Sequence, residues 1–190
     1  MIEIDNRFNG QTMDMISKMP GAVFHKYRSD PFVFTASVYG IVGLYIGNDI
    51  YRISNFVQPA DFFGKKEDVA VFLIDEAAES EIKSCMDDGV LIDTPIDSII
   101  KKITVVNEHQ QLFNKGIQTY DVYVTRAIIF EMEDGGEISF EKDIWFSEEI
   151  NIRRGHDLID KLSSTDSFAE NWEGIEGYDT KCDRESIIMA

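Results

Sequence analysis

Apolar and polar positions alternate over much of the chain in the two-residue period of β-strands. Phe32 to Ile46 is rich in Val, Phe, Tyr and Ile, and Gly47-Asn48-Asp49 separates it from the apolar run Ile50 to Val57. Two such runs joined by turn residues predict a β-hairpin. Tyr120 to Met132 begins a second hairpin pattern, which turns at Glu133 to Gly136 and returns over Glu137 to Phe140.

Four segments show helical signals instead. Thr12 to Lys18 carries apolar residues at helical spacing before Pro20-Gly21, and a brief helix is expected over Gly155 to Leu162. Asp75 to Met86 begins with an acidic residue suited to capping and is followed by Gly89. Thr94-Pro95 starts another predicted helix, with isoleucines at 96, 99 and 100.

These elements predict an α+β protein of mostly antiparallel sheets with short flanking helices. Their order recurs with an offset of about 84 residues, which suggests two similar αβ halves. We therefore expect a first half over 1–92, a second half over 93–162 packed on the first, and an acidic C-terminal tail over 163–190. Apolar residues thin out after Ser163, so the tail is expected to have little regular structure of its own.

Composition indicates a cytoplasmic chain. Among its 190 residues are two cysteines, Cys85 and Cys182, which fit no CxxC spacing, so we expect free thiols in a reducing compartment. The N-terminus lacks the basic and apolar regions of a signal peptide, and no apolar run approaches the length of a membrane span.

Charge is the most distinctive property of the sequence. The net charge is −17, and residues 61–98 alone hold 11 acids and 3 bases, while residues 163–190 hold 7 acids and 2 bases. Such a chain repels phosphate backbones, so neither direct nucleic-acid binding nor an anionic membrane partner is expected. A basic protein would be attracted. Acidity that serves only solubility is the alternative.

No motif predicts a cofactor or a metal. Glycine-rich phosphate loops and nucleophile elbows are absent from the sequence, and the histidines are His25, His109 and His156. Glu108 and His109 are adjacent at the end of a predicted strand, and such a pair could act in acid–base catalysis. A small nuclease using Glu108 and His109 is therefore one functional alternative.

The favoured prediction is a non-enzymatic inhibitor that docks on the basic groove of a nucleic-acid enzyme by mimicking nucleic acid. Anti-CRISPR and anti-restriction proteins are small, acidic and poor in motifs in the same way. An immunity protein for a bacterial toxin is a further alternative, and the oligomeric state stays open. The candidate binding residues are carboxylates and one aromatic residue: Glu67, Asp68, Glu76, Glu79, Asp87, Asp88, Glu148, Glu149, Trp172 and Glu173.

Overall fold

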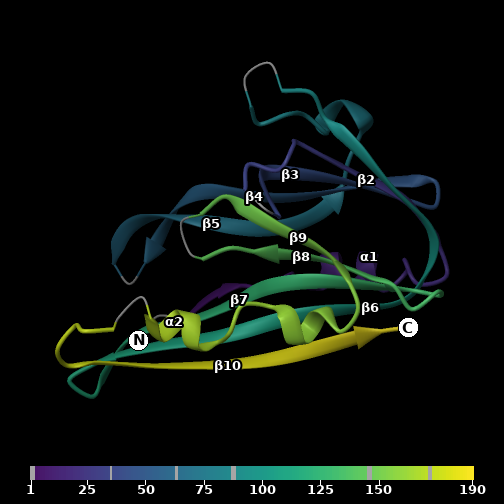
Figure 1. Cartoon of the computed structure of the whole chain (residues 1–190). Helices are drawn as coiled ribbons and strands as arrows, with labels where there is room; N and C mark the ends of the chain where they lie inside the picture. The colour runs from purple at the N-terminus through teal and green to yellow at the C-terminus, as the bar shows by residue number, and fades with distance from the viewer. Residues whose placement is uncertain (1–2, 35, 63, 87–88, 145–146, 171–172) are drawn as a thin grey trace.

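The structure is a computed structural model, and it describes residues 3–34, 36–62, 64–86, 89–144, 147–170 and 173–190. The fold is mostly β, with 61% of residues in strands and 11% in helices. Figure 1 shows strands in two layers, with the helices on their outside and between them. The strands are β1 (Ile4–Asn6), β2 (Val23–Ser29), β3 (Ser37–Ile46), β4 (Asp49–Phe62), β5 (Lys65–Glu76), β6 (Ile92–Asn114), β7 (Ile117–Met132), β8 (Glu137–Lys142), β9 (Glu149–Gly155) and β10 (Tyr178–Met189).

The helical elements of the described residues are short. Two of them are α-helices, α1 (Gly10–Ile16) and α2 (Asp166–Glu170), and two are 3-10 helices, Glu79–Glu81 and Leu158–Lys161. The Asn9 side chain caps α1 by accepting a hydrogen bond from the backbone N–H of Thr12 at 2.9 Å. Such a cap satisfies one of the amide donors that the first turn of a helix leaves without a partner.

The long strand β6 connects the two layers. Its first residues, Ile92 to Ile99, pair with β2, and its remainder pairs with β7. Since β2 also pairs with β3, β3 with β9, β9 with β8 and β8 with β7, the hydrogen-bonded path returns to β6 and forms a closed ring of strands. The β4–β5 hairpin extends this ring on one side, and β10 lies antiparallel to β6 on the other (Figure 1).

The hydrophobic core fills one end of the ring. Phe130 of β7 packs edge-on against Phe24 of β2, with ring centroids 5.3 Å apart, and against Phe140 of β8 at 6.1 Å. All three rings are fully buried. Ile16 of α1 and the following Met19 belong to the same core, so α1 closes this end of the ring.

The predicted fold class is wrong. The expected α+β arrangement with short flanking helices is replaced by a large mixed sheet, in which β1 pairs parallel with β7 and the other pairs are antiparallel. The helix predicted over Asp75 to Met86 is also wrong. The structure describes all of these residues, and their only helical part is the 3-10 helix Glu79–Glu81. Thr94 onward is not a helix but part of β6.

A β-bulge explains the second error. Between the pairs Phe24–Ser98 and Lys26–Pro95, β6 advances three residues while β2 advances two. Asp97, within this bulge, has a φ of 50°. The extra residue shifts the alternation of inward side chains, so the isoleucines at 96, 99 and 100 acquire a spacing that resembles a helix.

The predicted repeat is also wrong, because it required helices at both of these places. The two hairpins are confirmed as β3–β4 and β7–β8, and the first helix is confirmed as α1. The brief helix near the end is confirmed only as the 3-10 helix Leu158–Lys161. The division at 92/93 and 162/163 stays a prediction.

The C-terminal segment is more regular than expected. It contains α2 and β10, whose 12 residues pair with β6 from Tyr178–Asn114 to Met189–Ile103. No side chain of β10 is fully buried, and apolar and polar residues do not alternate regularly along its sequence. Backbone hydrogen bonding to β6 therefore fixes a strand that the side-chain pattern does not indicate. No described helix has the length and apolar character needed to cross a membrane.

Candidate functional site

The predicted acidic residues of β5 lie at opposite ends of that strand. Glu67 and Asp68 pair with Ala60 and Pro59, whereas Glu76 pairs with Tyr51. Nine residues of extended chain separate Glu67 from Glu76, which corresponds to about 30 Å. These carboxylates are exposed but do not form one cluster.

Cations are interleaved with the acids near the second end of β5. Arg28 of β2 contacts both Glu79 and Asp93, and Lys26 reaches Asp93 at 2.6 Å. The hydrogen bonds from Arg28, followed by those from Lys26, hold the pKa of Asp93 well below its ordinary value despite partial burial. The acids of this region are thus partly neutralised within the protein itself.

The segment that leads into β9, with the candidates Glu148 and Glu149, has structural contacts. Glu148 accepts a hydrogen bond from the backbone N–H of Val57 at 2.8 Å, and Asn55 donates to the carbonyls of Ser147 and Glu149 at 3.0 Å. These bonds join the start of β9 to β4. Three further candidates, Asp87, Asp88 and Trp172, lie outside the described residues.

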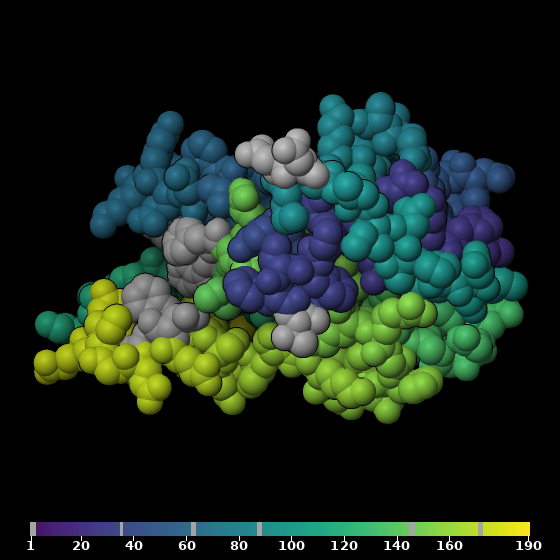
Figure 2. All heavy atoms as spheres, turned by 45° about the horizontal axis from the view of Figure 1, so that its top comes forward, coloured from purple at the N-terminus to yellow at the C-terminus, as the bar shows by residue number. Residues whose placement is uncertain are grey.

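The C-terminal segment forms an acidic hollow, which we define by Asp166, Glu170, Glu173 and Asp179. It has a volume of about 610 Å³ and lies between α2 and the start of β10, with Ile175 and Tyr178 also on its wall. All four carboxylates are exposed, and none has an ion pair with a described residue. In Figure 2 this segment (yellow) occupies one lower edge of the molecule, apart from the β4–β5 tip (blue).

The wall of the acidic hollow is held in place by packing. Phe168 of α2 is buried and stacks on Tyr120 of β7, with ring centroids 5.9 Å apart. The Gly177 carbonyl accepts a hydrogen bond of 2.7 Å from the backbone N–H of Lys115, in the β6–β7 turn. The carboxylates are therefore presented from a fixed platform. Of the predicted site residues, Glu173 belongs to this hollow. The other three acids, Asp166, Glu170 and Asp179, were not predicted, although the acidic and aromatic composition of 166–185 was a signal for them.

Glu108 and His109 are committed to different partners. The Glu108 carboxylate accepts hydrogen bonds from Arg184 and from Gln110, the latter at 2.8 Å. The His109 ring bonds to Asp121 through Nε2 at 2.7 Å and stacks on Tyr123 at 4.0 Å. Successive side chains of a strand point to opposite faces of the sheet, which separates the two groups.

A buried ionic cluster lies on the same face of β6, β7 and β8 as Glu108. Glu141 is fully buried, and it accepts hydrogen bonds from Arg126 at 3.2 Å, from Arg153 and from the backbone of Ser163. Burial raises the pKa of Glu141, but Arg126, the Ser163 hydrogen bond and Arg153 outweigh it and lower that pKa overall. This cluster is not predictable from the sequence, because no local pattern distinguishes a charge buried in a strand from one on its exposed face.

Among the described ranges, no three His, Cys, Asp or Glu side chains are grouped closely enough to hold a metal ion. No protein-family model, curated protein or solved structure matches the chain.

Proposed function

We propose that this chain is a non-enzymatic binding protein that docks on the basic groove of a nucleic-acid enzyme and inhibits it. The observation that supports the proposal most is the acidic hollow between α2 and β10. Residues 166–180 contain five acids and no Lys or Arg. The hollow thus differs from the Arg28 region, where the protein supplies its own cations.

Apolar residues in the hollow add contact area. Ile175 is 47% exposed, and Tyr178 lies beside it, half-buried. Binding surfaces commonly combine an apolar or aromatic anchor with polar groups around it. Because Phe168 and Gly177 fix the platform, little conformational freedom would be lost on binding.

The charge of the hollow favours a partner whose groove holds phosphates. Enzymes that act on nucleic acids have positive grooves, and exposed carboxylates can occupy the phosphate positions. An overall charge of −17 would accelerate the encounter at low ionic strength. A basic toxin would be recognised through the same chemistry, so an immunity protein is the alternative that differs only in the identity of the partner.

The proposal includes a cytoplasmic location. Cys85 and Cys182 are both free, and cysteines of this kind are typical of a reducing compartment. Enzymes that handle nucleic acids are found there as well.

The test is a binding titration against a panel of heparin-binding nucleases at rising salt. We expect an affinity that falls by at least about tenfold as sodium chloride rises from about 50 to 500 mM, because exposed charges are screened over this range. The nuclease activity should fall in parallel with occupancy. Affinity that ignores salt, or binding without inhibition, would contradict the proposal.

A further inference from the structure

Strand β10 has one edge with no strand partner among the described residues. It lies at the end of the sheet order, and its 12 residues pair with β6 alone (Figure 1). Apart from the N–H of Tyr178, which donates to the carbonyl of Ile175, no backbone group of β10 bonds to a described segment other than β6. About half of the N–H and C=O groups of such a strand point outward, where a further strand could pair with them.

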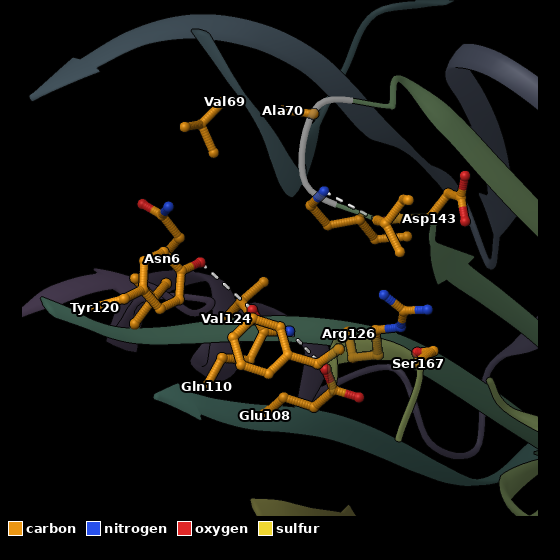
Figure 3. Close-up of a pocket in the computed structure, with 14 residues that line it drawn as sticks. Asn6, Val69, Ala70, Glu108, Gln110, Tyr120, Val124, Arg126, Asp143 and Ser167 are labelled. Atoms are coloured by element: carbon orange, nitrogen blue, oxygen red, sulfur yellow. Dashed lines mark hydrogen bonds between the residues drawn. The ribbon is translucent and has the colours of Figure 1, made fainter. Parts of the chain in front are cut away.

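Side-chain contacts hold β10 in place on β6. Arg184 donates hydrogen bonds from Nε to Oε1 of Glu108 at 3.2 Å and from Nη2 to the carbonyl of Ser163 at 2.6 Å. Glu108 in turn accepts a hydrogen bond from Gln110, and both line a hollow between the two layers (Figure 3). The outer edge of β10 is therefore presented from a fixed position, so little conformational freedom would be lost when a further strand pairs with it.

The charge and exposure of β10 favour contact with a second copy of the chain. Residues 178–190 carry three acids and two bases, whereas the whole chain has a net charge of −17. Local repulsion between two copies is therefore weak where their β10 strands meet. The strand ends in an apolar run, in which Ile187 is 39% and Ile188 is 64% exposed. Exposed strand edges that carry apolar residues readily pair with another chain.

We propose that β10 pairs with β10 of a second copy in antiparallel orientation, about a two-fold axis at Asp183. Such an axis is perpendicular to the sheet, so side chains on the same face of the two strands lie opposite each other. Lys181 then lies opposite Glu185 of the second copy, and the symmetry forms this ion pair twice. The exposed Ile188 lies opposite Tyr178 of the second copy, and pairs of an aromatic and a β-branched residue stabilise sheets.

Lys181 and Glu185 are accessible for this pairing. Their side chains are 59% and 60% exposed. Within the described chain, Oε1 of Glu185 lies 3.7 Å from Nη1 of Arg7 and 3.4 Å from Nδ2 of Asn107, long distances that leave the carboxylate available. Lys181 contacts Asp183 of its own strand, so the two ammonium groups offset the approach of the two Asp183 carboxylates at the axis.

The neighbouring registers are less favourable. Moving the axis by one residue to Cys182 places Asp179 opposite Glu185 of the second copy. Moving it by one residue in the other direction, to Arg184, brings the two Arg184 side chains together. Like charges directly opposite each other destabilise a sheet, so the charge pattern of β10 favours the axis at Asp183 over both. Dimerisation through β10 does not depend on docking through the acidic hollow.

The test measures the mass of the intact chain by sedimentation equilibrium over about 1–200 µM, at about 0.15 M salt to screen the net charge. We expect a dimer with a Kd in this range. Lys181→Glu and Glu185→Lys each convert both ion pairs into like-charge contacts, so each should weaken the dimer by about tenfold or more. The matched controls are Lys66→Glu and Glu67→Lys, at exposed positions of β5. They change the net charge equally and should leave the Kd within about twofold of the parent value.

Restoration by charge exchange separates loss of the interface from loss of the fold. In an equimolar mixture of Lys181→Glu and Glu185→Lys, one chain has acids at both positions and the other has bases, so the heterodimer regains two ion pairs. The double variant exchanges the two charges within one chain. Both samples should dimerise with a Kd within about threefold of the parent value. A parent that stays monomeric up to about 200 µM, single variants that dimerise as tightly as the parent, or a mixture and a double variant that both stay monomeric would overturn the proposal.

Discussion

Arg28 of β2 and Asp93 of β6 lie directly opposite each other and are joined by two hydrogen bonds, from Nε to Oδ1 at 2.5 Å and from Nη2 to Oδ2 at 3.0 Å. The pair closes the strand ring at the point where β6 crosses between the layers. Arg28 also contacts Glu79, one of the acids that the sequence assigns to a binding surface.

Replacement of Asp93 by Asn should lower stability in a pH-dependent manner. Arg28 holds the pKa of Asp93 below its ordinary value, so the ionised form stabilises the fold fully above the ordinary value, and this contribution is lost as the pH falls from there through the lowered pKa. Because the pair is partly exposed, we expect a loss of only about 0.5–1 kcal/mol at neutral pH. In urea unfolding, the gap between the parent and Asp93→Asn should narrow progressively as the pH is lowered from about 5 to about 2. Asp14→Asn, at an exposed position of α1, serves as the control.

Truncation of Phe130 should destabilise the protein strongly. Its aromatic ring contacts those of Phe24 and Phe140 in the hydrophobic core, and all three side chains are fully buried. We expect Phe130→Ala to cost about 3–5 kcal/mol in the free energy of unfolding. Phe34→Ala, at a residue that is 65% exposed, should change it by less than about 0.5 kcal/mol. Similar losses for both variants would mean that the core lies elsewhere.

Loss of the Glu141 charge should cost about 3 kcal/mol or more, because Arg126 would remain buried without its anion. Glu141→Gln is the variant, and chemical denaturation at neutral pH is the measurement. Glu131→Gln is a suitable comparison, since Glu131 also contacts two cations, Lys101 and Lys102, but at the surface. The comparison variant should lose less than about 1 kcal/mol. Equal losses would show that burial of Glu141 has no energetic consequence.

Hairpins were predictable because both of their signals are local. Turn residues at 47–49 and at 133–136 interrupt alternating apolar runs, and the structure has β-hairpins at both places. The false helix at Thr94 arose from equally local signals, a capping residue, a proline and isoleucine spacing. Pairing of β6 with β2 and a bulge at Asp97 override those signals, and neither can be deduced from the segment alone.

The candidate site was also predictable only where its signal is local. Acidity of the C-terminal segment is visible in the sequence, and it led to Glu173, which lies in the acidic hollow. The pairing of Arg28 with Glu79 and Asp93 joins residues far apart in the chain, so the sequence does not reveal that these acids are neutralised. The cluster around Glu141 depends on four different strands and loops, and no residue spacing indicates it.

Removal of residues 178–190 should unfold or aggregate the protein. Without β10, the outer edge of β6 from Ile103 to Asn114 is exposed, and Glu108 loses its partner Arg184. Exposed strand edges pair with other chains, and a buried charge without its partner costs about 3–5 kcal/mol. Size-exclusion chromatography and thermal unfolding of the shortened chain measure both effects. A monomer with an unchanged midpoint would show that β10 is not part of the stable fold.

The most direct measurement of the proposed function compares two charge-neutralising double variants for binding to a heparin-binding nuclease at fixed low salt. Glu170→Gln with Glu173→Gln removes two charges from the acidic hollow, and Glu67→Gln with Asp68→Asn removes two exposed charges from the β4–β5 tip. Docking through the hollow predicts that the first double variant weakens binding by about tenfold or more, while the second changes it less than about twofold. Equal weakening by both would show that net charge alone attracts the nuclease and would contradict a docking site at α2 and β10.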